Sequence, residues 1–75
     1  MGGGGVAVVL TVRIDVEDDE RFIGEVPELP GVLVYATTRE QAAVKAKALA
    51  LRVLADRVER GEALDAVCFT PRPSR

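Results

Sequence analysis

Hydrophobic and polar residues alternate along the first part of the chain. Within residues 6–16 every even position is apolar, while the odd positions change from apolar to polar toward the end of the segment. This period of two predicts a β-strand with one buried face. Residues 17–20 are all acidic and predict a turn, and the alternation that resumes over residues 21–26 predicts a second strand. The two strands are therefore expected to form a hairpin.

The segment VPELPG, residues 26–31, follows directly and contains two prolines. Proline lacks an amide hydrogen and restricts the preceding residue to extended conformations, so this segment should end the second strand without pairing as a central one. Pro30 and Gly31 suit the two middle positions of a type II turn. We interpret the segment as a rigid arch that ends the second strand and directs the chain into a third. The alternative is direct contact with a partner, for which Glu28 and Leu29 would be displayed between the prolines.

A long helix is the clearest predicted element, and it follows the third strand, which residues 32–36 are expected to form. Thr38 and Gln41 fit a capping box at the start of this helix. Thr37 and Glu40 offer the same pattern one residue earlier. The sequence therefore fixes the start of the helix to within one residue.

The end of the helix is expected at Gly61, because glycine is favoured directly after a helix. Apolar residues, many of them alanine, recur on one face at helical spacing and predict close packing on a sheet. The apolar band is wider than one sheet face requires, which favours contact with a second subunit through three further residues, namely Leu51, Leu54 and Val58.

A short fourth strand is predicted over residues 65–70, where two nearby prolines close the pattern. The resulting order, β-β-β-α-β, predicts an α+β fold in which a three-stranded antiparallel sheet and the short fourth strand pack on one helix. Residues 6–70 are expected to form a single domain. Residues 1–5 would then be a flexible glycine leader and residues 71–75 a C-terminal tail.

Composition adds an expectation about assembly. Hydrophobic residues make up 48% of the 75 residues, but only 4% are aromatic, so the core must consist mainly of valine, leucine and alanine. A domain of this size removes only about 60% of its unfolded surface from water, so we expect a homodimer or homotetramer. The sequence has no apolar run near the ~20 residues that cross a bilayer, and Cys68 has no second cysteine to pair with. We expect a cytoplasmic protein without a membrane partner.

Charge is distributed unevenly, although the net charge is only −2. Residues 15–28 carry seven carboxylates against one base, whereas residues 39–60 carry six bases against three acids. The acidic run is either a solvated turn or a surface that fits a basic partner. On the second interpretation, the candidate partner-binding residues are Asp18, Asp19, Glu25, Glu28 and Leu29.

Catalytic chemistry finds little support in the sequence. The chain has no histidine and no glycine-rich phosphate loop, and a lone cysteine without a base partner is not activated. Asp15 and Glu25 raise the alternative of a nuclease that holds Mg²⁺ on strand carboxylates, but most of the acids lie in one turn without enclosure. We therefore expect a protein that is not an enzyme and that uses no cofactor or metal.

Three segments, FIGEVPELPG at residues 22–31, TREQA at residues 38–42 and RGE at residues 60–62, carry a family resemblance. Together with the order of the elements they resemble the HicB family of bacterial antitoxins over residues 8–62. The resemblance implies a partial ribonuclease H-like fold without catalysis, and a protein that neutralises HicA, a small basic ribonuclease toxin. Full-length relatives add a C-terminal DNA-binding segment, and the five residues after Thr70 are too few for one. We therefore do not expect direct binding to operator DNA.

Two functions are consistent with these observations. The first is an antitoxin that covers the basic RNA-binding surface of a toxin that cleaves mRNA. The alternative is a stand-alone oligomeric protein of the HicB fold that has a structural or metabolic role and no toxin partner.

Overall fold

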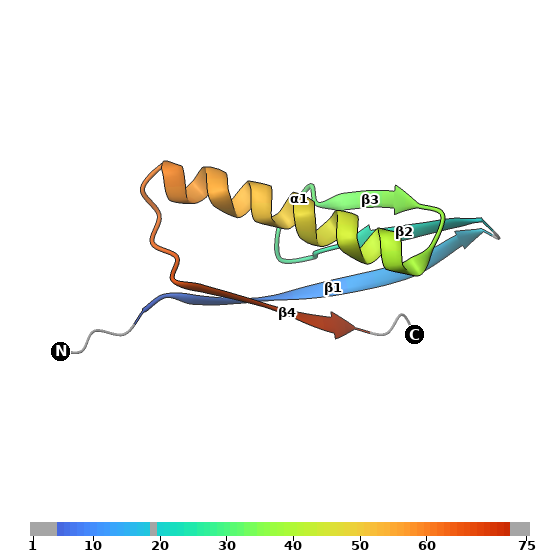
Figure 1. Cartoon of the computed structure of the whole chain (residues 1–75), viewed down its shortest axis with the longest axis horizontal. Helices are drawn as coiled ribbons and strands as arrows, with labels where there is room; N and C mark the ends of the chain where they lie inside the picture. Colours follow the sequence, from blue (N-terminus) through green and yellow to red (C-terminus); the bar gives the residue numbers. More distant parts are fainter. Residues whose placement is uncertain (1–4, 19, 73–75) are drawn as a thin grey trace.

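The computed structural model describes residues 5–18 and 20–72, and Figure 1 shows the chain. In this part of the chain a four-stranded sheet forms one layer, and a long helix lies along one of its faces as the second layer (Figure 1). The predicted order of elements is confirmed. The elements are β1 (Ala7–Asp18), β2 (Arg21–Glu25), β3 (Leu33–Ala36), α1 (Arg39–Glu59) and β4 (Ala66–Arg72).

The strand order in the sheet is β3-β2-β1-β4. β1, β2 and β3 pair antiparallel, as the sequence predicts, whereas β4 pairs parallel with β1. The parallel pairing arises because α1 carries the chain back along the sheet before β4 begins, so the sheet is mixed.

The fourth strand differs from its prediction in extent. β4 has seven residues, which makes it longer than β2 or β3, and it ends at Arg72 instead of Thr70. Pro71 lies inside this strand and is paired in register with Val12. A proline is tolerated there because β4 is an edge strand whose outer side needs no amide hydrogen. The predicted tail therefore begins two residues too early, and residues 73–75 lie outside the described part.

The arch at residues 26–31 has the predicted turn. Gly31 has a φ of 94°, and the Val32 N–H donates to the Leu29 carbonyl at 3.1 Å, as a type II turn requires. Two side chains of the arch, Val26 and Leu29, point inward and are buried in the core, as is Val32 directly after it. The expectation that Leu29 is displayed is wrong, since burying a leucine side chain is favourable by about 1.5–3 kcal/mol.

Both ends of α1 are capped by side-chain and backbone groups. The Gln41 N–H donates to Thr38 Oγ1 at 3.0 Å, so the helix begins at the later of the two candidate threonines. In a full capping box the Gln41 side chain would accept the Thr38 N–H. Here Gln41 Oε1 instead accepts from the Thr37 hydroxyl at 3.4 Å. At the other end Gly61 has a φ of 105°, and the N–H groups of Gly61 and Glu62 donate to carbonyls of the last turn, which forms a Schellman motif.

Small residues bring α1 close to the sheet. Ala42, Ala46 and Ala50 are fully buried beneath it, and a Cβ at Gly24 would lie only 2.5 Å from the Ala42 carbonyl oxygen. Leu54 is also buried in this core, so its predicted role in subunit contact is wrong, whereas Leu51 and Val58 are exposed as expected. None of the described residues belong to a helix that has both the length and the apolar content to cross a membrane.

Candidate partner-binding surface

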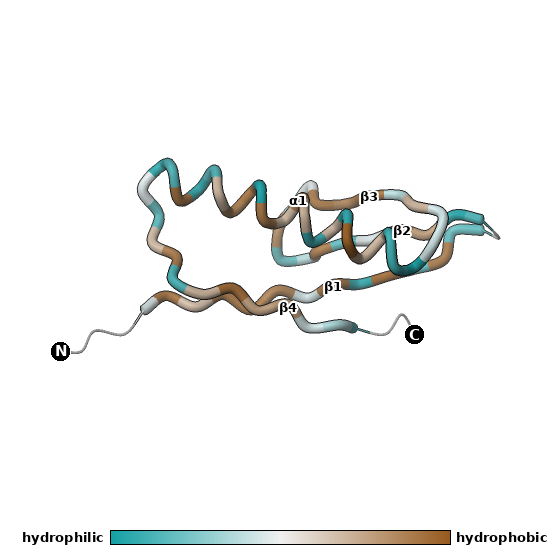
Figure 2. The backbone as a smooth tube through the Cα atoms, viewed as in Figure 1, coloured by the Kyte–Doolittle hydropathy of each residue, from teal (hydrophilic) through white to brown (hydrophobic). Residues whose placement is uncertain are grey.

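The most acidic exposed part of the described chain is the end of the β1–β2 hairpin. The pairing register of β1 with β2 shifts between Val16 and Asp18. Asp18 Oδ1 accepts the Glu20 N–H at 3.0 Å, a hydrogen bond by which aspartate commonly stabilises a turn. Figure 2 shows this end as hydrophilic. We call its three exposed carboxylates the acidic tip: Glu17, Asp18 and Glu20. Asp19, a fourth acid predicted here, lies outside the described residues.

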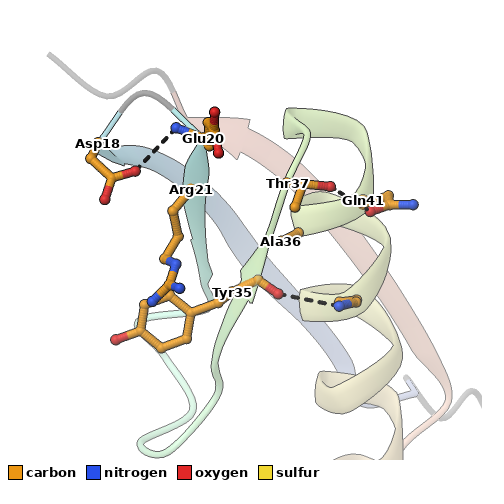
Figure 3. Close-up of a pocket in the computed structure, with 8 residues that line it drawn as sticks. Asp18, Glu20, Arg21, Tyr35, Ala36, Thr37 and Gln41 are labelled. Atoms are coloured by element: carbon orange, nitrogen blue, oxygen red, sulfur yellow. Dashed lines mark hydrogen bonds between the residues drawn. The ribbon is translucent and has the colours of Figure 1, made fainter.

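An open hollow of about 580 Å³ adjoins the acidic tip (Figure 3). Asp18, Glu20 and Arg21 form one wall, and the end of β3 and the first turns of α1 form the other. The Arg21 guanidinium lies 5.6 Å from the centre of the Tyr35 ring, within the range of a cation–π contact. Lys45 Nζ donates to the Tyr35 carbonyl at 3.2 Å, which ties α1 to β3.

The charges around this hollow are not equally available. Arg21 lies over the Tyr35 ring, and its Nε lies 3.9 Å from Glu17 Oε1. Its positive charge therefore offsets part of the negative charge of the tip. Asp18 and Glu20 have no basic side chain in salt-bridge contact among the described residues. They are therefore the carboxylates best placed to receive a lysine or arginine from another protein.

Glu25 lies away from the tip, although the sequence placed it in the same acidic run. It is the last residue of β2, four residues or about 13 Å along the strand from Arg21. It pairs in register with Arg13, whose Nε lies 3.2 Å from Asp15. The sheet face that α1 leaves uncovered thus mixes acids and bases here.

Glu28 is used within the molecule. Its Oε1 accepts the Thr11 N–H at 3.0 Å and its Oε2 accepts the Thr11 hydroxyl at 2.7 Å. These two hydrogen bonds hold the pKa of Glu28 below its ordinary value, the one from the Thr11 backbone N–H more strongly than the one from the hydroxyl. The pairing of β2 with β1 stops at Arg13, so the Glu28 carboxylate takes the place of a strand partner and fastens the arch to β1.

Of the four predicted partner-binding residues that the structure describes, only Asp18 lies at the acidic tip. Glu25 lies at the far end of β2, Glu28 lies in the arch, and Leu29 is 3% exposed in the core. Sequence reasoning did not select Glu20, nor the hollow formed with Tyr35 and Lys45. The available sequence signal was Arg21, the only base in the acidic run; in the structure its guanidinium lies over the Tyr35 ring.

The carboxylates on the strands do not gather into a metal site. Asp15 and Glu25, the pair that suggested a nuclease, share the uncovered face with Arg13, which is ion-paired with Asp15. Across residues 5–18 and 20–72, no three aspartate, glutamate or cysteine side chains are grouped so that they could hold a metal ion.

No protein-family model, no curated protein and no solved structure matches this chain. Membership of the HicB family therefore stays a prediction from the residue segments quoted above. The function is inferred from the fold and from the acidic tip.

Proposed function

We propose that this chain is a non-catalytic, antitoxin-like binding protein that acts in the cytoplasm. Its partner would be a HicA-type toxin that cleaves mRNA, and it would neutralise that toxin by covering the basic surface that binds RNA. The observation that carries this proposal is the acidic tip, where Glu17, Asp18 and Glu20 are exposed together at the end of a hairpin.

The fold is compatible with this proposal. A β-β-β-α-β chain that forms one mixed sheet with a single covering helix fits the partial ribonuclease H-like fold that the family resemblance implies. The uncovered face and the tip also leave a large part of the sheet free for contact with another protein.

The physical basis of neutralisation is charge mimicry. A ribonuclease must present basic groups to the phosphates of its substrate, and exposed carboxylates can occupy the same positions. Opposite charges also speed the encounter of two proteins and fix their orientation. Asp18 and Glu20 can receive such basic groups, and the adjoining hollow has room for the side chains that carry them.

Co-expression with the product of the neighbouring reading frame tests the proposal. We expect a small basic protein that co-purifies with this chain and whose RNA cleavage stops when the two are mixed in equal amounts. A neighbouring ribonuclease that neither binds this chain nor loses activity in its presence would contradict the proposal.

A second function is favoured by a different observation. The outer face of α1 carries exposed apolar residues, which suits a stand-alone oligomer with a structural or metabolic role. The two functions are distinguished by the co-expression experiment, because the stand-alone protein would form its oligomer and ignore the ribonuclease.

A further inference from the structure

The side of α1 that faces away from the sheet is apolar from Val44 to Val58. Val44 is 65% exposed, Leu51 47% and Val58 44%, although these are among the larger apolar residues of the helix. They are spaced seven residues apart, with an alanine between each pair. We call these five residues the outer stripe: Val44, Ala48, Leu51, Ala55 and Val58.

The outer stripe is separate from the face that α1 buries. Ala42, Ala46 and Ala50 pack on the sheet, and the outer stripe lies on the opposite side of the helix. A surface helix of a two-layer protein normally carries polar residues on its outer side, and a helix that is apolar on opposite sides is normally covered on both. The outer stripe therefore requires a covering partner.

We propose that the outer stripe packs against the outer stripe of a second copy of this chain, with the two helices antiparallel. The sequence separation between successive residues of the stripe is alternately four and three. This is the separation found for the residues that lie between two packed helices in a coiled coil. Large and small residues also alternate along it. In an antiparallel pair Leu51 can fit against Ala55 of the partner subunit while Val58 fits against Ala48 of the partner subunit, and Val44 lies at the edge of the overlap.

Charges beside the outer stripe favour this orientation and register. Lys45, Arg52 and Glu59 follow the stripe on one side, seven residues apart. In the proposed register Lys45, which donates to the Tyr35 carbonyl within its own chain, also lies opposite Glu59 of the partner subunit at two symmetric places. The two copies of Arg52 face each other once and repel. A parallel pair would instead place Lys47 beside Arg52 of the partner subunit twice and Glu40 beside Lys45 of the partner subunit twice, so its repulsive and attractive contacts would be equal in number.

The dimensions of the domain also favour a second copy. α1 has 21 residues and is about 31 Å long, and the stripe, from Val44 to Val58, extends over about 21 Å of it. A domain of this size gains from burying additional apolar surface. The uncovered sheet face is a weaker candidate, because Arg13, Asp15, Arg21 and Glu25 interrupt its apolar residues.

Antiparallel association has a consequence for binding that rests on the proposed function. The acidic tip lies at the end of the molecule where α1 begins (Figure 1). Two antiparallel helices would place the two tips at opposite ends of the dimer, and each tip could bind its own ribonuclease.

Oligomeric state tests the interface without any ribonuclease, so its outcome is independent of the proposed function. We expect sedimentation equilibrium to show a dimer for the wild type and at least about tenfold weaker association for Leu51→Glu. Leu33→Glu is a matched control, because Leu33 is also 47% exposed but lies on β3. A monomeric wild type, or a dimer that Leu33→Glu disrupts and Leu51→Glu does not, would overturn the proposal. Circular dichroism checks that each variant is folded.

Cysteine cross-linking then tests the orientation in a Cys68→Ser background. A mixture of Ala48→Cys and Val58→Cys proteins should form a disulfide under mild oxidation. Val58→Cys protein alone should not, because two antiparallel copies of this position lie about 15 Å apart, beyond disulfide reach. Cross-linking of Val58→Cys alone, or no cross-linking of the mixture, would overturn the antiparallel arrangement.

Discussion

At the scale of single residues, the bond between Glu28 and Thr11 makes the fold sensitive to acid. The pKa of Glu28 is lowered in the folded state by hydrogen bonds that the unfolded chain lacks. Its contribution to stability is therefore fully present above the ordinary pKa of 4.5, and it is lost as the pH falls through the lowered value. Acidification should loosen the arch from β1.

Thr11→Val tests this link by removing the hydroxyl donor while keeping the backbone N–H. We expect the pKa of Glu28 to move upward toward 4.5, and the stability lost on acidification to become smaller. Carbon-detected NMR titration of the Glu28 carboxyl group measures the first effect. Thr70→Val is the control, since the Thr70 hydroxyl donates to the Leu10 carbonyl and not to a carboxylate. An unchanged Glu28 titration in Thr11→Val would contradict the assignment.

Gly24 is the second residue whose role depends on one contact. A Cβ there would lie 2.5 Å from the Ala42 carbonyl oxygen, which belongs to the helix backbone and cannot move aside alone. Gly24→Ala should lower the free energy of unfolding by about 1–3 kcal/mol, as measured by urea denaturation.

Gly31→Asn provides a contrast to that substitution. Gly31 has no atom within 4 Å of an added Cβ, and asparagine adopts a positive φ more readily than most residues. Asparagine is still strained at this φ but meets no steric clash, so this variant should lose no more than about 1 kcal/mol of stability. Equal stability of Gly24→Ala and wild type would show that α1 does not sit as close to β2 as described.

These residues also show what the sequence can and cannot reveal. The turn at Pro30 and Gly31 and the stop at Gly61 were predictable, because each follows from the conformational limits of the residue itself. The roles of Gly24 and Glu28 were not, because their partners, Ala42 and Thr11, lie 17 or more residues away and only the folded chain brings them together.

At the scale of elements, the start of α1 depends on one threonine. Thr38 Oγ1 accepts the Gln41 N–H, whereas the neighbouring Thr37 only donates a long hydrogen bond to the Gln41 side chain. Thr38→Ala should lower the free energy of unfolding by about 1 kcal/mol and the Tm by about 4–8 °C. Thr37→Ala should change the free energy by less than about 0.5 kcal/mol. Similar losses in both variants, measured by thermal denaturation, would contradict the assigned cap.

The elements were predictable to the extent that they follow local periodicity. The pattern of residues 6–16 predicted most of β1, but it could not show that one half of this strand pairs with β2 and the other with β4. Pro71 was predicted to end the fourth strand, because a proline is tolerated inside a strand only at a sheet edge. That β4 is an edge strand is a property of the whole sheet and could not be known from the local sequence. Leu29 and Leu54 were assigned to the surface for the same reason: burial depends on neighbours from other elements.

At the scale of the whole molecule, acidic charge is concentrated at one end and apolar surface along one side. The acidic tip closes the hairpin, while the outer stripe follows the helix. The two surfaces can therefore be occupied at the same time. The sequence predicted the acidic run. It did not show that the run divides into the acidic tip, the carboxylates on the uncovered sheet face and Glu28, which bonds to Thr11, because strand pairing decides which of these carboxylates lie together.

The central claim is that the acidic tip binds a cationic ribonuclease, and calorimetric titration of the co-purified partner tests it most directly. The double variant Asp18→Asn/Glu20→Gln removes two charges, and the asparagine can still accept the Glu20-position N–H that closes the turn. The control Asp56→Asn/Glu62→Gln removes two exposed charges beside the other end of α1. We predict about tenfold weaker binding for the tip variant at low ionic strength, a smaller loss in high salt, and unchanged binding for the control. Equal affinity of the tip variant and the wild type at low ionic strength would contradict the claim.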